Sequence, residues 1–204
     1  MKKAKIAVLV SGGGTNLQAL IDAQRDGIIT HGEIGLVVSS KADAYALHRA
    51  QNADIETLVL PKKELGQSAF EEQLTKALEG FDLIILAGFM TILTEEFTRH
   101  FEGKIINVHP SLIPAFCGEG YYGLRVHEEA LKRGVRVTGA TVHYVNEIPD
   151  GGKIILQKAV RVFDGDTPER LQQRVMRQAE WKILPRAVEK VAAQMQKTKT
   201  EKNI

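Results

Sequence analysis

The chain has 204 residues, a length that fits one large domain. Its hydrophobic fraction is 44% and its charged fraction is 25%, which are ordinary values for a globular protein and exclude a disordered or coiled-coil chain. The 27 basic and 25 acidic residues leave a net charge of +2, which is too small to indicate binding to nucleic acid or to a membrane surface.

The cysteine content indicates a reducing compartment, and the length of the apolar runs argues against a membrane span. Cys117 is the single cysteine, so no disulfide can form within the chain. The longest apolar run, residues 83–90, is much shorter than the about 20 residues that a membrane span needs. We therefore expect a cytoplasmic protein, with a frayed, lysine-rich tail at residues 196–204.

Short apolar runs alternate with segments of helical periodicity over the first half of the chain. In chain order, they predict a strand at 6–10, a helix at 15–26, a strand at 34–39, a helix at 44–52, a strand at 57–60, a helix at 68–78, a strand at 83–87, a helix at 95–101 and a strand at 105–108. Alternation of this kind is typical of a parallel sheet flanked by helices.

The second half of the chain has a different pattern. It predicts a long loop at 109–123, a helix at 126–133, strands at 137–145 and 154–162, and a helix that begins at Pro168 and that Pro185 should kink or break. The predicted fold class is therefore α/β: a Rossmann-like, mostly parallel sheet flanked by helices, with an added antiparallel strand pair in the C-terminal half. We expect one domain at 1–195, with its two halves at 1–108 and 109–195.

A glycine-rich loop at residues 11–16, Ser-Gly-Gly-Gly-Thr-Asn, follows the first strand and opens the first helix. The unpaired N–H groups and the positive dipole end of a helix favour an anion, and glycine lets the backbone approach it closely. The loop is not a dinucleotide fingerprint, because the third glycine would fall at Leu17, and it lacks the Gly-Lys-Ser/Thr of a P-loop. A phosphate site is favoured, with a plain glycine turn as the alternative.

Asn107 and His109 stand two residues apart at the end of the last parallel strand, so both side chains face the same side. Ligands of open α/β sheets bind beyond the carboxyl ends of the strands, where the glycine loop also lies. Asp150, in Pro-Asp-Gly-Gly, is either a turn residue or a carboxylate that folds over this crevice. In the second case it would raise the pKa of His109 and hold the imidazole as a cation. A histidine bonded to backbone at a strand end is the alternative for His109.

Other catalytic patterns are absent or weak. The sequence has no Gly-x-Ser-x-Gly or His-Glu-x-x-His motif, and its 6 histidines show no spacing of metal ligands, so we expect no metal. Cys117 is better explained as a small hydrophobic residue than as a nucleophile. Trp181 fits a core or interface position, and Glu180 beside it fits a solvated helix charge.

Two further segments resemble known sequences. Residues 105–114, Ile-Ile-Asn-Val-His-Pro-Ser-Leu-Ile-Pro, resemble the signature of the folate-dependent formyltransferases. Residues 86–90, Leu-Ala-Gly-Phe-Met, resemble the folate-site segment of the same superfamily. The glycine loop resembles the phosphate loop of the members that act in purine synthesis. The resemblance covers residues 5–188, nearly the whole chain.

The resemblance implies formyl transfer from 10-formyltetrahydrofolate, a co-substrate, to the amine of glycinamide ribonucleotide, without a metal. The amine attacks directly, and Asn107 and His109, with Asp150, stabilise the tetrahedral intermediate. It also implies three groups of site residues. The catalytic group is Asn107, His109 and Asp150. The group that binds glycinamide ribonucleotide is Gly12, Gly13, Gly14, Thr15, Asn16 and Glu180. The group that binds folate is Met90, Thr91, Ile92, Leu93, Asn107, Glu147 and Ile148.

The sequence also departs from the family pattern. Thr91 stands where an arginine is common, Gln67 stands where some members have a folate-contacting arginine, and the loop at 116–123 is longer than usual. The alternatives are a formyl-folate hydrolase, which usually carries an extra N-terminal domain, and formyl transfer to another amine, such as an aminoacylated tRNA. A third alternative is a phosphate-binding module without catalysis, which would require the occurrence of Asn107, His109 and Asp150 together to be a coincidence. We expect small-molecule partners rather than nucleic acid or a membrane, and a homo-oligomer is compatible with the sequence.

Overall fold

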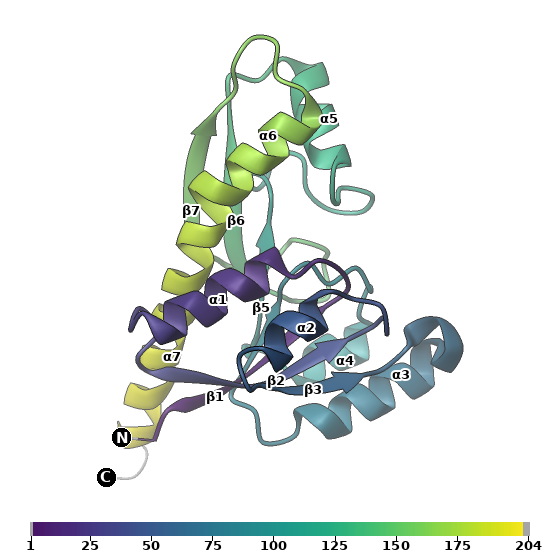
Figure 1. Cartoon of the computed structure of the whole chain (residues 1–204), viewed down its shortest axis with the longest axis vertical. Helices are drawn as coiled ribbons and strands as arrows, with labels where there is room; N and C mark the ends of the chain where they lie inside the picture. The colour runs from purple at the N-terminus through teal and green to yellow at the C-terminus, as the bar shows by residue number, and fades with distance from the viewer. Residues whose placement is uncertain (1, 202–204) are drawn as a thin grey trace.

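Seven strands form one sheet in the computed structural model, which describes residues 2–201 (Figure 1). The strands are β1 (Ala4–Val10), β2 (Gly32–Ser39), β3 (Glu56–Val59), β4 (Leu83–Leu86), β5 (Ile105–His109), β6 (Val137–Tyr144) and β7 (Ile154–Arg161). Their order across the sheet is β3-β2-β1-β4-β5-β6-β7. The pairs from β3 to β5 are parallel, whereas β5 pairs with β6, and β6 with β7, in antiparallel orientation. The predicted fold class is confirmed.

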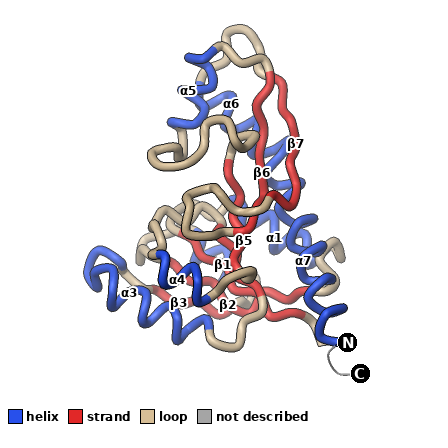
Figure 2. The backbone as a smooth tube through the Cα atoms, turned by 180° about the vertical axis from the view of Figure 1, so that it is seen from behind, coloured by secondary structure: helices blue, strands red, loops and turns tan. Residues whose placement is uncertain are grey.

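Helices cover both faces of this sheet, as the view from behind in Figure 2 shows. They are α1 (Thr15–Arg25), α2 (Ala46–Gln51), α3 (Lys62–Leu78), α4 (Glu95–His100), α5 (Arg125–Arg133), α6 (Pro168–Val175), the π-helical segment η1 (Met176–Glu180) and α7 (Trp181–Glu201). The predicted helices agree with these within a few residues, except that α3 begins earlier, before a kink at Gly66. Among residues 2–201, no helix is long and apolar enough to cross a membrane. Of the predicted tail, α7 includes the part up to Glu201, and 202–204 lie outside the described residues.

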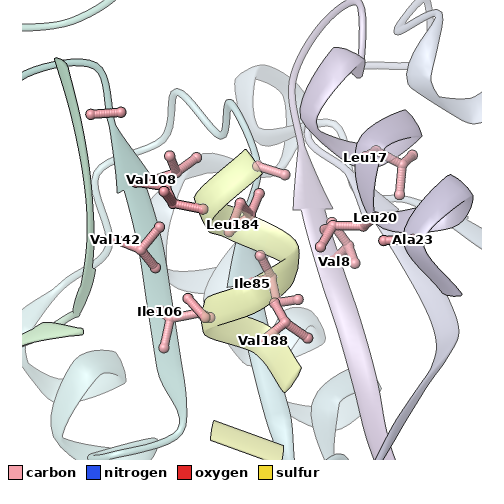
Figure 3. Close-up of a cluster of buried hydrophobic side chains, with 14 of the residues drawn as sticks. Val8, Leu17, Leu20, Ala23, Ile85, Ile106, Val108, Val142, Leu184 and Val188 are labelled. Atoms are coloured by element: carbon pink, nitrogen blue, oxygen red, sulfur yellow. The ribbon is translucent and has the colours of Figure 1, made fainter. Parts of the chain in front are cut away.

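Alternating residues of β1 supply the two hydrophobic cores of the sheet. Val8 belongs to the core under α1 and α7, whereas Leu9 belongs to the core under α3 and α4, and both side chains are completely buried. Figure 3 shows the first core, in which Leu20 of α1 and Leu184 of α7 lie over the sheet. A strand that is buried on both faces needs apolar residues at consecutive positions, which explains the continuous apolar run.

A kink or a break was predicted at Pro185, and the break does not occur, because Pro185 lies inside α7 and does not end it. Proline removes one hydrogen bond from a helix, but tertiary packing can override this local preference. Leu184 and Val188 are completely buried in the core on the side of the sheet, and this burial holds the helix (Figure 3). The regular α-helical pattern is interrupted earlier, at η1, a type of turn that is frequent at functional sites.

Glu189 ties α7 to the segment that precedes β2. Its carboxylate accepts hydrogen bonds from the amides of Thr30 and His31 at 2.8 and 3.0 Å, and from the Thr30 hydroxyl at 2.7 Å. His31 Nδ1 lies 2.5 Å from the same carboxylate. Burial acts to raise the pKa of Glu189, but these contacts outweigh burial and lower the pKa to about 2. The ionised carboxylate therefore stabilises the folded chain at neutral pH.

We expect Glu189→Ala to lower the free energy of unfolding by about 2 kcal/mol at pH 7, because two amides lose a charged acceptor. Folding depresses the pKa of Glu189, so its contribution is complete above the ordinary carboxyl pKa of ~4.3 and is lost as the pH falls through about 2. Urea unfolding should therefore show a smaller difference from wild type at pH 3 than at pH 7. Lys190→Ala, at the exposed neighbouring position, is the control. Equal stability of Glu189→Ala and wild type at pH 7 would contradict this assignment.

Candidate functional site

Three functional segments meet at the carboxyl ends of β1, β4 and β5, where β4 pairs with β1 on one side and with β5 on the other. The glycine loop follows β1, the segment 90–93 lies beyond the end of β4, and Asn107 and His109 belong to β5. The carboxyl ends of parallel strands lie at one edge of a sheet, which is where ligands bind in open α/β folds. The structure therefore brings the three predicted groups to one edge.

The glycine loop directs its amides away from α2. The carbonyl of Gly12 accepts from the amide of Ala46 at 3.0 Å, and the carbonyl of Gly13 accepts from Arg49 Nε at 2.8 Å. Because C=O and N–H lie on opposite sides of a trans peptide, the amides of Gly13 and Gly14 point to the other side, and no backbone group among the described residues accepts from them. Gly14 has a φ of +70°, and a Cβ there would lie 2.6 Å from Ala46 Cβ. The loop thus offers free N–H groups at the positive end of α1.

Glu180 is buried beside the glycine loop, so its interpretation as a solvated helix charge was wrong. Asn16 Nδ2 donates to Glu180 Oε2 at 2.7 Å, whereas Asn16 Oδ1 is buried with no hydrogen-bond partner in the described part of the chain. Burial raises the pKa of Glu180 to about 6, and the hydrogen bond from Asn16 opposes this rise. Glu180 is the last residue of η1, which carries it against α1. Its role as a substrate ligand stays a prediction.

The segment 90–93 exposes large apolar side chains while its backbone is held in place. The amide of Met90 donates to Ser11 Oγ at 3.0 Å, which ties the segment to the start of the glycine loop. The Met90 side chain is 51% exposed and that of Ile92 is 76% exposed. An ordered apolar surface of this kind fits a flat ring system such as the pterin of a folate.

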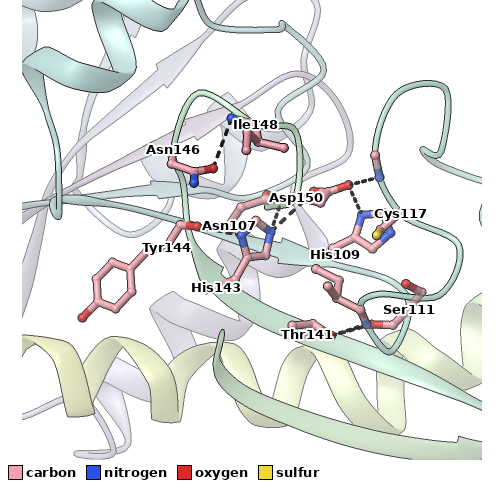
Figure 4. A network of polar contacts seen from close by, with 12 residues as sticks. Asn107, His109, Ser111, Cys117, Thr141, His143, Tyr144, Asn146, Ile148 and Asp150 are labelled. Atoms are coloured by element: carbon pink, nitrogen blue, oxygen red, sulfur yellow. Dashed lines mark hydrogen bonds and ion pairs between the residues drawn. The ribbon is translucent and has the colours of Figure 1, made fainter. Parts of the chain in front are cut away.

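Antiparallel pairing of β5 with β6 brings a second histidine to the site. Asn107 lies opposite His143, and His109 lies opposite Thr141, so these side chains share one face of the sheet. His143 Nδ1 donates to the carbonyl of Tyr144 at 2.8 Å, and Nε2 lies 3.3 Å from Asn107 Nδ2. A neutral ring accepts at Nε2 from Asn107, whereas an imidazolium donates there to Asp150. His143 therefore orients the amide of Asn107, as Figure 4 shows.

Asp150 contacts both histidines from the turn between β6 and β7. Its Oδ2 lies 3.3 Å from His109 Nδ1, and its Oδ1 lies 3.4 Å from His143 Nε2 (Figure 4). The same Oδ2 accepts from the amide of Gly118 at 2.9 Å. The four side chains of Asn107, His109, His143 and Asp150 therefore form one polar network, which we call the catalytic cluster because it contains the three residues of the predicted catalytic group.

The two glycines that follow Asp150 explain how the turn reaches this position. A Cβ on Gly152 would lie 1.7 Å from the carbonyl oxygen of Tyr144, so only glycine lets the turn pack against the end of β6. Asp150 itself has a φ of +56°, which aspartate tolerates better than most residues. Of the two interpretations of Asp150, the structure shows the carboxylate folded over the crevice. Its catalytic role stays a prediction.

Burial dominates the ionisation of His109. The side chain is 4% exposed, and its burial lowers the pKa below the ordinary value, although Asp150 and the Phe116 carbonyl act in the opposite direction. Asp150 does act to raise the pKa of His109, as predicted, but the expectation of a cation was wrong, because removal from water disfavours the cation more than the carboxylate favours it. Burial also acts to raise the pKa of Asp150, but the two histidines and the Gly118 amide outweigh it and lower that pKa.

The loop at 109–123 lies over the catalytic cluster. His109 Nε2 donates to the carbonyl of Phe116 at 2.8 Å. The thiol of Cys117 donates to the carbonyl of Pro114 at 3.3 Å, and partial burial raises its pKa above the ordinary value. A cysteine with a raised pKa carries little thiolate at neutral pH and is a weak nucleophile, which supports its interpretation as a small hydrophobic residue.

The remaining predicted residues lie near this edge without joining the catalytic cluster. Thr15 opens α1, Thr91 and Leu93 are partly buried, and Glu147 and Ile148 are exposed in the turn before Asp150. The sequence analysis missed His143. The alternation of polar Thr141 and His143 with apolar neighbours could have placed both beside the polar residues of β5 once antiparallel pairing was assumed. In the described part of the chain, no group of three or more His, Cys, Asp or Glu is arranged to hold a metal ion.

Three comparisons relate the chain to known proteins. Residues 4–188 match the formyl transferase family. The chain is 45% identical to phosphoribosylglycinamide formyltransferase of Haemophilus influenzae, over 89% of this chain and 84% of that protein. It is 47% identical to the trifunctional purine biosynthetic protein adenosine-3 of Bos taurus, but covers only 19% of that protein's length. The structure of glycinamide ribonucleotide transformylase 1 from Symbiobacterium toebii superposes with a TM-score of 0.86 at 42% identity, covering 94% of this chain and 88% of that chain.

Proposed function

Because the chain belongs to the formyl transferase family, we propose that it transfers the formyl group of 10-formyltetrahydrofolate to the amine of glycinamide ribonucleotide. The names of its relatives support this acceptor and a place in purine synthesis. The observation that carries the proposal is the catalytic cluster, which lies at the sheet edge where the glycine loop and the segment 90–93 also end.

The acceptor binds on the side of β1. Its phosphate accepts hydrogen bonds from the free amides of the glycine loop, at the positive end of α1 (Gly12, Gly13, Gly14 and Thr15). Its ribose hydroxyls pair with Asn16 and Glu180, since Asn16 Oδ1 is a buried acceptor that lacks a partner among the described residues. The donor lies on the other side of the edge, with its pterin against Met90 and Ile92 and between the segment 90–93 and the turn that holds Glu147 and Ile148.

Asn107 stabilises the oxyanion of the reaction. The acceptor amine attacks the formyl carbon, a C–N bond forms, and the formyl oxygen becomes an oxyanion in a tetrahedral intermediate. The Asn107 amide has two hydrogens, of which His143 accepts one, so the second is free to donate to this oxygen. One such donor contributes about 3 kcal/mol to the stability of a transition state.

His109 moves the proton that the reaction must transfer. The attacking amine loses a proton, and N10 of the folate gains one as its bond to the formyl carbon breaks. Burial lowers the pKa of His109 and so favours the neutral ring, which can accept the first proton and release it to N10. Because Nδ1 faces Asp150, this transfer uses Nε2, which must exchange its hydrogen bond to the Phe116 carbonyl for a contact with the substrates. Asp150, 3.3 Å from Nδ1, stabilises the imidazolium that forms in between. Holding two substrates at one edge supplies much of the remaining rate enhancement.

The test of this function is to follow loss of the formyl group from 10-formyltetrahydrofolate with and without glycinamide ribonucleotide. Loss that requires the ribonucleotide, with formylated ribonucleotide recovered by mass spectrometry, is the expected result. Loss at the same rate without the ribonucleotide would identify a formyl-folate hydrolase. No loss in either mixture, with both ligands bound, would show that another amine is the acceptor.

A further inference from the structure

Two polar side chains of α3 contact the far end of the segment 90–93. Gly66, with a φ of +75°, interrupts α3 near its start, so the main helix begins at Gln67, and Glu71, four residues on, lies one turn later on the same face. Gln67 Nε2 donates to the carbonyl of Ile92 at 3.1 Å and to Glu71 Oε1 at 2.7 Å. Gln67 therefore fixes the backbone at Ile92 directly.

Glu71 holds the residue that follows the segment. Its Oε1 accepts from the amide of Thr94 at 2.8 Å, and its Oε2 accepts from the Thr94 hydroxyl at 2.5 Å. The Thr94 hydroxyl in turn accepts from the amide of Phe97 and caps the start of α4. With the hydrogen bond from Gln67, the Glu71 carboxylate thus accepts three hydrogen bonds. Their donors are Gln67, which contacts the segment 90–93, and Thr94, which follows it.

Ser11 holds the near end of the segment. Its hydroxyl accepts from the amide of Met90 at 3.0 Å and can donate its own hydrogen to Ser40 Oγ, 2.7 Å away. Ser11 and Ser40 are 4% and 7% exposed. The backbone is therefore held at Met90, Ile92 and Thr94, while the large side chains of the segment stay exposed to a ligand.

We propose that Glu71 and Gln67 are positioning residues that set the affinity for the folate donor, because they hold the segment 90–93 in its binding conformation. This inference rests on the proposed function. A segment that is ordered before binding loses less conformational entropy when the ligand arrives, and this difference appears as affinity. Among the described residues, no hydrogen bond joins α3 to the glycine loop, and the loop is linked to the segment at its opposite end, through Met90 and Ser11, so loss of the contacts from α3 should leave the acceptor site largely unchanged.

The test compares Glu71→Ala with wild type in titration calorimetry with tetrahydrofolate. Loss of three hydrogen bonds to a charged group should raise the dissociation constant about tenfold. The KM for 10-formyltetrahydrofolate should rise by the same factor, while kcat and the KM for glycinamide ribonucleotide stay at their wild-type values. Glu72→Ala is the matched control, because the neighbouring carboxylate pairs with exposed Lys76 and should leave every parameter unchanged.

Two further variants separate positioning from folding. Glu71→Gln keeps one carbonyl oxygen for the Thr94 amide and should give an intermediate dissociation constant. Gln67→Ala removes only the contacts of one partly exposed side chain. If Glu71→Ala does not fold, the dissociation constant of Gln67→Ala for tetrahydrofolate tests the inference in its place, and it should also rise. An unchanged dissociation constant in Glu71→Ala, or a fall in kcat with unchanged affinity, would overturn the inference. Wild type that binds tetrahydrofolate but transfers no formyl group would refute the proposed function instead, while the affinity comparison would still test the positioning role.

Discussion

Asp150→Asn is expected to lower kcat by about 100-fold, because it removes the carboxylate that lies against both histidines of the catalytic cluster. Asparagine has nearly the same shape and tolerates the positive φ of this position, so the turn should be kept. An imidazolium formed at His109 would then lack its counter-charge within the buried site. The loss should therefore appear in the chemical step, while the glycine loop and the segment 90–93 still bind their ligands.

The measurement is kcat at saturating concentrations of both substrates, with the affinity for tetrahydrofolate and the midpoint of thermal unfolding measured on the same preparations. Asp164→Asn is the matched control, since that carboxylate pairs with exposed Arg136 at the surface. We expect the control to keep wild-type kcat. A kcat for Asp150→Asn within about threefold of wild type would remove Asp150 from the mechanism.

His109→Ala is expected to lower kcat/KM by about 1000-fold, since it removes the group that carries the proton from the amine to N10. His143, the other imidazole against Asp150, contacts Oδ1 of that carboxylate, whereas His109 contacts Oδ2, so His109→Ala leaves Oδ2 without an imidazole partner. His100→Ala, at the exposed end of α4, is the control and should behave as wild type. Activity of His109→Ala close to that of wild type would show that another group transfers the proton.

The pH profile tests the ionisation of His109 separately. Burial lowers its pKa below the ordinary value of 6.5, and the neutral form is the one that accepts a proton. For wild type, kcat/KM should therefore fall as the pH drops through a pKa below 6.5, and His109→Ala should lack this acidic limb. A decrease on the alkaline side that depends on His109 would mean that the imidazolium is the active form instead.

Much of the fold follows from local sequence patterns. The apolar runs of β1 and β4 predict strands that are buried on both faces, and both lie in the centre of the sheet. The predicted start at Pro168 is confirmed, and the hydroxyl of Thr167, a residue type that favours helix starts, accepts from the amide of Arg170. The helix predicted at 126–133 ends at Gly134, which adopts the left-handed conformation with a φ of +74°. Each of these signals acts within a few residues of the chain.

The errors concern effects that depend on tertiary structure. Glu180 has the sequence context of an exposed helix residue, but η1 and α1 enclose it. The pKa of His109 depends on how completely the loop at 109–123 covers it, which charge spacing in the sequence does not specify. Gln67 of α3 contacts the Ile92 carbonyl, which is 25 residues further along the chain. The folate-site motif at 86–90 therefore points to the segment 90–93 but not to the side chains that hold it.

The order of strands in the sheet also places the substrate-binding contacts and the reacting side chains on different strands. The acceptor phosphate is assigned to the loop after β1, the donor pterin chiefly to the segment beyond β4, and Asn107, His109 and His143 lie on β5 and β6, which are successive positions across the sheet. Among the described residues, no hydrogen bond joins Asn107 or His143 to the glycine loop. Changes in the loop after β1 could therefore redirect the protein to an amine with another anionic group without disturbing the catalytic cluster. In this arrangement, exchange of one loop would change the site for the anionic group of the acceptor, while the ribose contacts at Asn16 and Glu180 would remain on α1 and η1.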